Sequence, residues 1–173
     1  MLVRHAKSAW PPEVPDHDRP LGRRGLRDAP ALGRWLRRAG CVPDHVLCST
    51  ARRARDTWRL AESELDARPH VSYERRVYDD SADGLLQMIR RLPSKAVTVL
   101  IVGHDPAIQD LAVALARQEE ADRQPQMASL TRMREKFPTA AVALLEISAP
   151  WSELAREDAR LASFTTPRDM DEV

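Results

Sequence analysis

The strongest constraint on the fold is a pair of short apolar runs that each end on a histidine. The first is Leu2-Val3-Arg4-His5 and the second is Leu100-Ile101-Val102-Gly103-His104. Runs rich in Leu, Ile and Val are typical of buried strands in a parallel sheet. Ligands of open α/β sheets bind beyond the carboxyl ends of the strands. Both histidines are therefore expected at the edge that holds the active site.

The rest of the chain alternates between extended and helical patterns. The expected strands are the apolar segments 2–3, 45–48, 97–102, 139–147 and 161–165, with an ambiguous extended segment at 71–78. The expected helices are the segments 22–39, 51–65, 81–92, a helix that opens at 105–106 and a short one at 130–136. This alternation predicts a three-layer α/β/α sandwich with a mostly parallel central sheet, built as a single domain over residues 1–173.

Polar and proline residues predict where these helices begin and break. Pro30 is expected to bend or restart the first helix, with Asp28 as a candidate N-cap. Ser49 or Thr50 is the expected N-cap of the second helix, segment 51–65. Asp105 is the expected cap of the helix that follows the second histidine, with Pro106 in its first turn. Surface loops are expected at residues 9–20 and 118–126.

Composition excludes several classes of function. The net charge is +1, so no strong basic field recruits nucleic acid or an acidic membrane. The longest apolar runs are too short to span a bilayer. Cys41 and Cys48 form no C-x-x-C pair and are expected to be reduced thiols of a cytoplasmic protein. The first apolar run is brief, which leaves open a start upstream of Met1.

A third apolar run, residues 46–48, leads through Ser49 and Thr50 into a helix that carries Arg53 in its first turn. Helix N-termini bind phosphate well. Arg4 and Arg53, with the two histidines, are therefore expected to surround one phosphoryl group. A histidine can attack phosphorus as a nucleophile, and fixed cations supply most of the remaining catalysis. We expect neither a metal nor a cofactor.

These motifs resemble the histidine phosphatase superfamily. The resemblance rests on Arg4-His5, on the spacing Ser49-x-x-x-Arg53-Ala54-x-x-Thr57, and on Gly103-His104, in the family's order. Arg4-His5-Ala6-Lys7-Ser8, followed by Asp18-Arg19-Pro20-Leu21, is similar to its short SixA-type branch of phosphohistidine phosphatases. The resemblance implies a phosphoglycerate mutase-like fold.

It also implies roles for individual residues. His5 matches the nucleophile that becomes phosphorylated. Arg4 and Arg53 match the arginines that bind the phosphoryl oxygens, and His104 matches the histidine that hydrogen-bonds the phosphoryl group. Asp79 lies roughly where many members place a proton donor.

The proton donor and one further phosphate contact stay open. Asp80 and Glu74 are alternatives to Asp79 as the donor. Lys7 is either solvated or an additional phosphate-binding residue. His17, near the first motif, is a candidate for the pocket rim, whereas His45 and His70 are expected to be structural.

The departures from the family pattern bear on the substrate. Ala6 replaces the signature glycine, and Pro11 stands where mutases place an asparagine, so a sugar-phosphate mutase is disfavoured. The chain lacks long lid insertions, which suits a phosphohistidine on a protein. The alternatives are a small phosphorylated metabolite or a non-catalytic phosphate-binding module. The arginines of segment 22–39 are read as a solvated face, or as a docking patch for an acidic partner.

Overall fold

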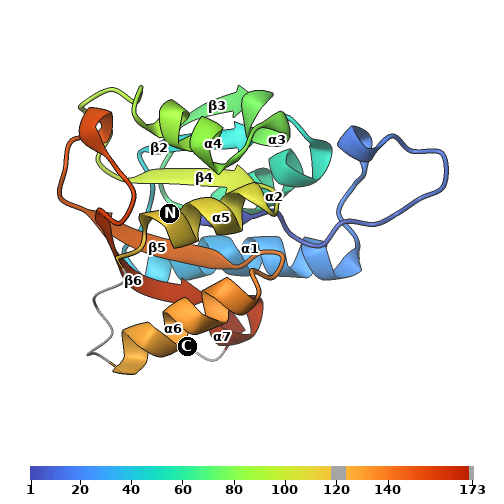
Figure 1. Cartoon of the computed structure of the whole chain (residues 1–173). Helices are drawn as coiled ribbons and strands as arrows, with labels where there is room; N and C mark the ends of the chain where they lie inside the picture. The colour runs from blue at the N-terminus through green and yellow to red at the C-terminus, as the bar shows by residue number, and fades with distance from the viewer. Residues whose placement is uncertain (118–123, 172–173) are drawn as a thin grey trace.

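The central feature of the computed structural model is a six-stranded sheet in the order β3-β2-β4-β1-β5-β6 (Figure 1). The structure describes residues 1–117 and 124–171. The strands are β1 (Leu2–Arg4), β2 (His45–Ser49), β3 (His70–Glu74), β4 (Val99–Gly103), β5 (Val142–Ile147) and β6 (Ala159–Thr165). The four strands from β3 to β1 pair in parallel, whereas β5 runs antiparallel to both β1 and β6.

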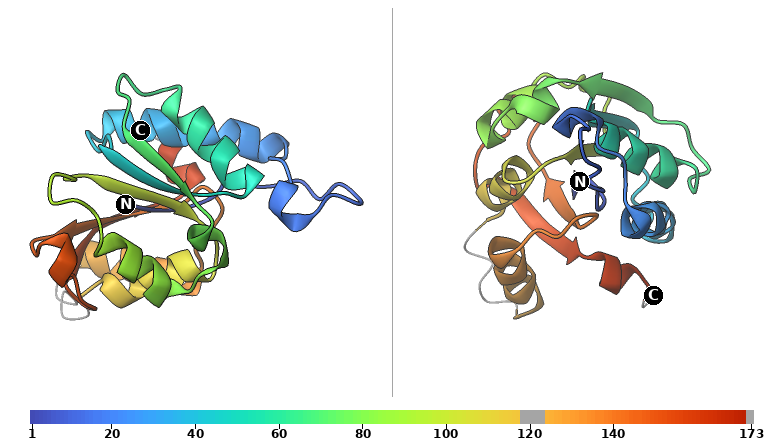
Figure 2. Two further views of the ribbon diagram at one scale, coloured as in Figure 1. Left: turned by 90° about the horizontal axis from the view of Figure 1, so that it is seen from above. Right: turned by 90° about the vertical axis from the view of Figure 1, so that its right-hand side faces the viewer.

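Helices cover both faces of this sheet (Figure 2). The α-helices are α1 (Arg23–Arg38), α2 (Arg52–Glu62), α3 (Arg76–Asp79), α4 (Ala82–Ile89), α5 (Ala107–Leu115), α6 (Gln124–Glu135) and α7 (Pro167–Asp171), and two 3-10 turns are η1 (Asp16–Asp18) and η3 (Trp151–Glu153). One face packs against α1, α2 and α7, and the other against α4, α5 and α6. The three-layer α/β/α prediction is confirmed.

The pleat of the strands divides the core between the two faces. Successive residues of a strand point to opposite sides. Thus Leu2 and Ile101 belong to the α4–α5–α6 side, whereas Val3 and Leu100 belong to the other. Because both sides are covered, the central strand β4 is continuously apolar and buried, as expected of a parallel sheet. No helix of the described residues is long and apolar enough to cross a membrane.

The expected restart of the first helix at Pro30 is wrong. Helix α1 runs through Pro30 without interruption, and Asp28 lies buried within it as a partner of Arg24 and Arg27. A proline inside a helix costs about 3 kcal/mol because it removes one hydrogen bond and crowds the preceding turn. The helix nevertheless continues, because residues such as Leu32 on its inner face are fully buried against the sheet.

The expected helix caps are also wrong, and for a common reason. Helix α2 has Ala51 at its N-cap, without a side-chain cap, while the Ser49 hydroxyl accepts a hydrogen bond from the Ala51 N–H and meets His104. Helix α5 begins at Ala107, and the Asp105 carboxylate pairs with Arg4 instead of capping it. In both cases the polar side chain is engaged with residues distant in the sequence.

Several boundaries differ from expectation. Segment 71–78 divides into β3 and α3, and the strand expected at 139–147 begins only at Val142 because Ala140 adopts a φ of 61° in a turn. The short helix expected at 130–136 is the end of the longer α6. Of the expected loop 118–126, residues 118–123 lie outside the described residues and 124–126 belong to α6.

Candidate active site

The parallel register of β1 and β4 brings the two strand-end histidines together. Arg4 is paired with Gly103 across these strands, so His5 and His104 follow at the same edge. Their ring centroids lie 4.9 Å apart. The structure thus joins two segments almost a hundred residues apart into one cluster.

Arg53 bridges the two rings. It lies in the first turn of α2, which follows β2, and β2 pairs in parallel with β4. Its Nε donates to His5 Nε2 at 3.1 Å, and its Nη2 lies 3.3 Å from His104 Nδ1. Thr57 holds this turn in place: its hydroxyl accepts from the Ala6 N–H at 2.9 Å and donates to the Arg53 carbonyl at 2.6 Å.

These contacts assign the protons on both rings. A guanidinium only donates hydrogen bonds, so His5 Nε2 and His104 Nδ1 must be acceptors. The other nitrogens then carry hydrogen: His5 Nδ1 donates to the Ala6 carbonyl at 2.7 Å, and His104 Nε2 donates to Ser49 Oγ at 2.7 Å. Both rings are neutral, and each directs a lone pair toward Arg53.

The electrostatics keep these rings neutral. Burial, followed by electrostatic interactions with His104, Arg53 and Arg4, lowers the pKa of His5 to about 3. Burial and the charge of Arg53 lower the pKa of His104 to about 4. A proton on either ring would be both desolvated and close to a cation. At neutral pH His5 Nε2 therefore carries no proton, and its lone pair accepts the hydrogen bond from Arg53 Nε.

Arg4 contributes its charge at the same edge. Its Nη1 donates to the Phe137 carbonyl at 2.7 Å and pairs with Asp105 Oδ2 at 2.6 Å. Burial raises the pKa of Asp105, although the charge of Arg4 opposes this shift. The guanidinium is thus fixed by two partners beside the histidines.

The site also contains two residues that the sequence analysis did not select. Asp16, in η1, accepts hydrogen bonds from Arg53 Nη2 and Tyr78 OH, both at 2.9 Å. Its backbone carbonyl accepts from Arg53 Nη1 at 2.5 Å. The Tyr78 ring meets His104 edge-on at 5.3 Å. The one available signal was the position of Asp16, two residues before the Asp18-Arg19-Pro20-Leu21 motif.

Lys7 is fixed through its backbone only. Its carbonyl accepts from the Gly22 N–H at 2.9 Å, and a Cβ on Gly25 would lie 2.2 Å from that carbonyl oxygen. Glycine is therefore required where α1 begins against this segment. The Lys7 side chain is exposed and has no ion pair within residues 1–117 and 124–171.

The structure places the expected proton donor on an exposed helix. Asp79 is in α3, where its carboxylate pairs with Arg75 at 3.0 Å and half of the side chain is exposed. Asp80 pairs with Arg76 in the same way. For the described residues, no contact joins Asp79 to the two histidines or to Arg53. His17 does reach the rim, where its Nε2 lies 3.0 Å from Thr50 Oγ1.

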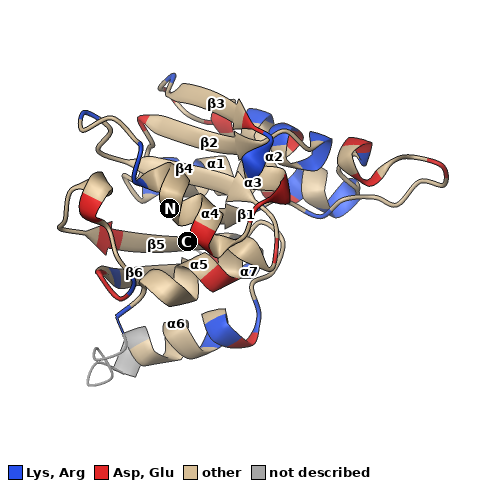
Figure 3. Cartoon of the chain, turned by 45° about the horizontal axis from the view of Figure 1, so that its top comes forward, with Lys and Arg blue, Asp and Glu red and all other residues tan. Residues whose placement is uncertain are grey.

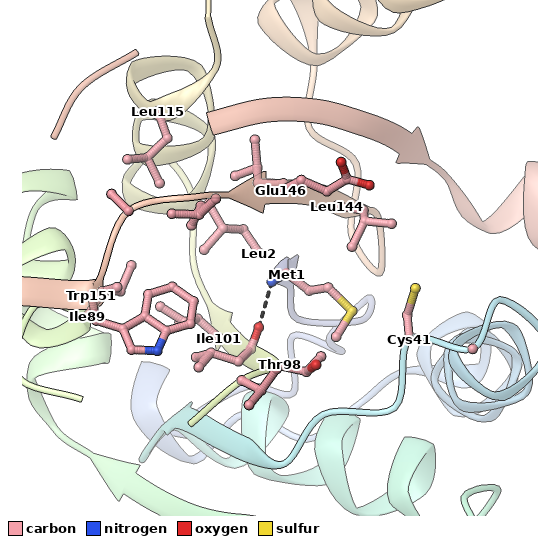
Figure 4. A pocket seen from close by; sticks show the side chains of 16 residues that line it. Met1, Leu2, Cys41, Ile89, Thr98, Ile101, Leu115, Leu144, Glu146 and Trp151 are labelled. Carbon is pink, nitrogen blue, oxygen red and sulfur yellow. Dashed lines mark hydrogen bonds between the residues drawn. The ribbon is translucent and has the colours of Figure 1, made fainter. Parts of the chain in front are cut away.

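A separate cavity lies at the opposite ends of the strands. It has a volume of about 360 Å³ and is lined mainly by apolar side chains, such as Leu2, Ile101 and Trp151 (Figure 4). The histidine–arginine cluster lies at the carboxyl ends, where basic residues gather around α2 (Figure 3). The charged groups needed to bind a phosphoryl group are thus at the carboxyl ends of the strands and not in the cavity.

Comparison with known proteins agrees with this geometry. The model of the histidine phosphatase superfamily (branch 1) matches residues 1–77. An uncharacterized protein of Mycobacterium tuberculosis is 40% identical over 166 residues, which cover 96% of this chain and 100% of that protein. The chain belongs to the histidine phosphatase superfamily.

Solved structures place it in the SixA-type branch of that family. A proposed SixA phosphohistidine phosphatase from Nakamurella is 34% identical, with a TM-score of 0.82 over 96% of this chain and 94% of the other. The protein histidine phosphatase SixA, solved with tungstate, shares the fold at 18% identity, with a TM-score of 0.77 over 97% and 96% of the chains. The enzyme is a phosphatase with a phosphoglycerate mutase-like fold.

Proposed function

We propose that this phosphatase hydrolyses phosphohistidine on a protein, through an intermediate in which His5 itself carries the phosphoryl group. The observation that supports this most is the Nε2 lone pair of His5, held neutral by burial and directed at a guanidinium. An imidazole in this state is a nucleophile that needs no base to activate it.

In the first step, Arg53 exchanges its hydrogen bond to His5 Nε2 for the phosphoryl oxygens, which frees the lone pair. His5 Nε2 then forms a bond to phosphorus, and the bond from phosphorus to the leaving group breaks. The electron pair of that bond stays with the leaving group. His5 keeps its Nδ1 proton, and the hydrogen bond to the Ala6 carbonyl stabilises the positive charge that the ring gains. That carbonyl also fixes the ring plane, so Nε2 keeps its direction during the attack.

The phosphoryl oxygens gain their stabilisation from fixed cations. Arg53 and Arg4 carry full charges beside the attacking nitrogen, and the first turn of α2 adds the positive end of its dipole. His104 stabilises the transferring group by donating its Nε2 proton to a phosphoryl oxygen. This hydrogen bond replaces the one that Nε2 donates to Ser49 Oγ. Such preorganised donors are worth most in a site from which water is excluded.

In the second step, water attacks the phosphorus of the intermediate. The water oxygen forms a bond to phosphorus and passes one proton to a phosphoryl oxygen. The bond from phosphorus to His5 Nε2 breaks, its electron pair returns to the ring, and dihydrogen phosphate leaves. Lys7, whose side chain is exposed, can join the phosphate oxygens. Asp79 serves as proton donor only if its pair with Arg75 opens.

The substrate proposal rests on access and on chemistry. Apart from the loop at residues 9–20, the described chain has no long insertion over the carboxyl edge (Figure 1). A phosphohistidine exposed on a folded partner can therefore approach. The proteins named SixA among its structural neighbours agree with this substrate. A small phosphorylated metabolite is the second candidate, because the same geometry attacks any accessible phosphoryl group.

A substrate comparison tests the proposal. We expect kcat/KM for a phosphohistidine-containing domain to exceed that for a panel of sugar phosphates, phosphoserine and phosphothreonine. Rapid quenching in alkali should trap a phosphoenzyme that is acid-labile, as a phosphoramidate is. A metabolite turned over far more efficiently than any phosphohistidine protein would replace the proposed substrate and leave the mechanism in place.

A further inference from the structure

A carboxylate stands at the mouth of the histidine–arginine site. Asp16 Oδ2 accepts hydrogen bonds from Arg53 Nη2 and Tyr78 OH, and Oδ1 accepts from Arg19 Nη1 at 2.8 Å. The Asp16 side chain is nevertheless 49% exposed. It therefore contacts the phosphate-binding arginine and also faces the solvent from which a substrate arrives.

Arg19 holds this carboxylate independently of Arg53. The Arg19 side chain is buried, and it donates to Ser8 Oγ at 2.6 Å and to the Ala9 carbonyl at 3.1 Å. These contacts tie η1 to the segment that follows β1. When a phosphoryl group takes up the Arg53 guanidinium, the contacts of Asp16 with Arg19 and Tyr78 remain and keep the carboxylate in place.

The charge state of Asp16 limits what it can do. Burial alone would raise its pKa, but hydrogen bonds from Arg19, Tyr78 and Arg53 outweigh that effect and lower the pKa to about 2. Asp16 is ionised at neutral pH and has no proton to give. Its influence on the reaction is therefore electrostatic.

A fixed negative charge at this place distinguishes two kinds of leaving group. In a phosphoimidazole, the ring is cationic when the nitrogen that is not bonded to phosphorus is protonated. When the P–N bond breaks, its electron pair stays on the ring nitrogen and neutral imidazole departs. In a phosphate ester, the electron pair of the broken P–O bond stays on the oxygen of the leaving group, and an anion departs. The carboxylate favours the cationic ring and repels the departing anion.

We propose that Asp16 is a specificity-determining residue, which selects leaving groups that are cationic when bound and neutral when they depart. The inference deepens the proposed function and rests on it, since it assumes that His5 attacks phosphorus. It explains why a phosphatase would keep an ionised carboxylate next to an anion site: the carboxylate acts on the leaving group.

The test compares two substrates that share a phosphoryl group. N-phosphoimidazole has a cationic leaving group and p-nitrophenyl phosphate an anionic one. In Asp16→Asn we expect the ratio of kcat/KM for phosphoimidazole to that for p-nitrophenyl phosphate to fall about tenfold, the factor that corresponds to one pKa unit of lost charge interaction. Because a ratio is measured on one preparation, partial misfolding cancels from it.

A pH profile gives a second readout. The carboxylate stabilises the protonated ring of bound phosphoimidazole, so its loss lowers the pKa of that ring. In single-turnover measurements with phosphoimidazole, the pH at which the rate falls by half should move down in Asp16→Asn. A purely structural role of Asp16 would lower the rate at every pH and leave this midpoint in place.

Two variants separate the possible outcomes. Asp18→Asn is the matched control, since Asp18 lies in the same turn, is 60% exposed and contacts His17; its ratio should match wild type. Equal losses on both substrates in Asp16→Asn would overturn the inference and leave the His5 mechanism standing. Turnover by His5→Ala would instead overturn the proposed function itself.

Discussion

Two pairs of histidines lie at opposite ends of the strands of the same sheet. His5 and His104 have ring centroids 4.9 Å apart at the carboxyl ends of β1 and β4. His45 and His70 have centroids 5.2 Å apart at the amino ends of β2 and β3. The spacing is nearly the same, so distance between imidazoles does not distinguish a site from a structural pair.

The surroundings make the difference. Between His5 and His104 lies the Arg53 guanidinium, and burial keeps both rings neutral. At the other edge, His45 meets the Asp44 carboxylate at 3.0 Å and His70 is exposed. The His5–His104 pair thus combines a lone pair held in place, low solvation and a nearby cation that excludes protons. We propose that these conditions make the His5 imidazole nucleophilic.

The largest expected effect is the loss of the nucleophile. His5→Ala should reduce turnover of p-nitrophenyl phosphate by about 10⁴-fold or more, because the variant lacks the proposed attacking lone pair. It should also abolish phosphoenzyme labelling. His70→Ala, which removes a histidine from the opposite pair, should keep wild-type kinetics. Comparable losses in the two variants would break the distinction between the pairs.

A smaller effect is expected for the second histidine of the site. His104→Ala should lower kcat by roughly 10²- to 10³-fold, the usual cost of removing one donor that stabilises a transition state. Some phosphoenzyme should still form, because His5 and Arg53 remain. Quenched-flow labelling measures this directly. If His104→Ala removed labelling altogether, His104 would have to share the nucleophilic role.

The pH dependence of stability should reflect the buried pair. The pKa of an unfolded histidine is about 6.5, whereas burial lowers the pKa of His5 to about 3 and the pKa of His104 to about 4 in the folded protein. As pH falls below 6.5 the unfolded state binds more protons, so the free energy of unfolding should fall by about 1.4 kcal/mol per pH unit for each histidine.

Urea denaturation of the wild type and of His104→Asn checks this expectation. The slope of the free energy of unfolding between about pH 4.5 and 6.5 should be about 1.4 kcal/mol per pH unit smaller in His104→Asn. His70→Ala is the control from the opposite pair. An unchanged slope in His104→Asn would mean that His104 is not held neutral by the fold.

The smallest effect is expected at Asp79. Its carboxylate already pairs with Arg75 on an exposed helix, so Asp79→Asn should change hydrolysis of both alkyl and p-nitrophenyl phosphates by less than about twofold. A proton donor would show a different pattern, with alkyl phosphates slowed far more because an alkoxide leaves poorly. That selective loss would establish Asp79 as the donor.

The local sequence was sufficient to predict that His5, His104 and Arg53 meet at the carboxyl ends of the parallel strands. Apolar runs that stop at His5, at His104 and just before Arg53 define strand ends, and parallel strands present their carboxyl ends together. Short-range sequence pattern is enough to predict both the strand ends and the parallel pairing. The three-layer fold followed from the same alternation of strands and helices.

Tertiary structure alone decided how those groups are held. Ser49 and Asp105 carry good capping signals but contact His104 and Arg4, because those partners come close only in the folded chain. Asp16 enters the site from a loop whose course depends on Arg19 and Tyr78. The sequence by itself determined that the two histidines and Arg53 form one cluster. Long-range hydrogen bonds, which no local pattern encodes, decided which ring nitrogens carry protons and brought Asp16 and Tyr78 to the cluster.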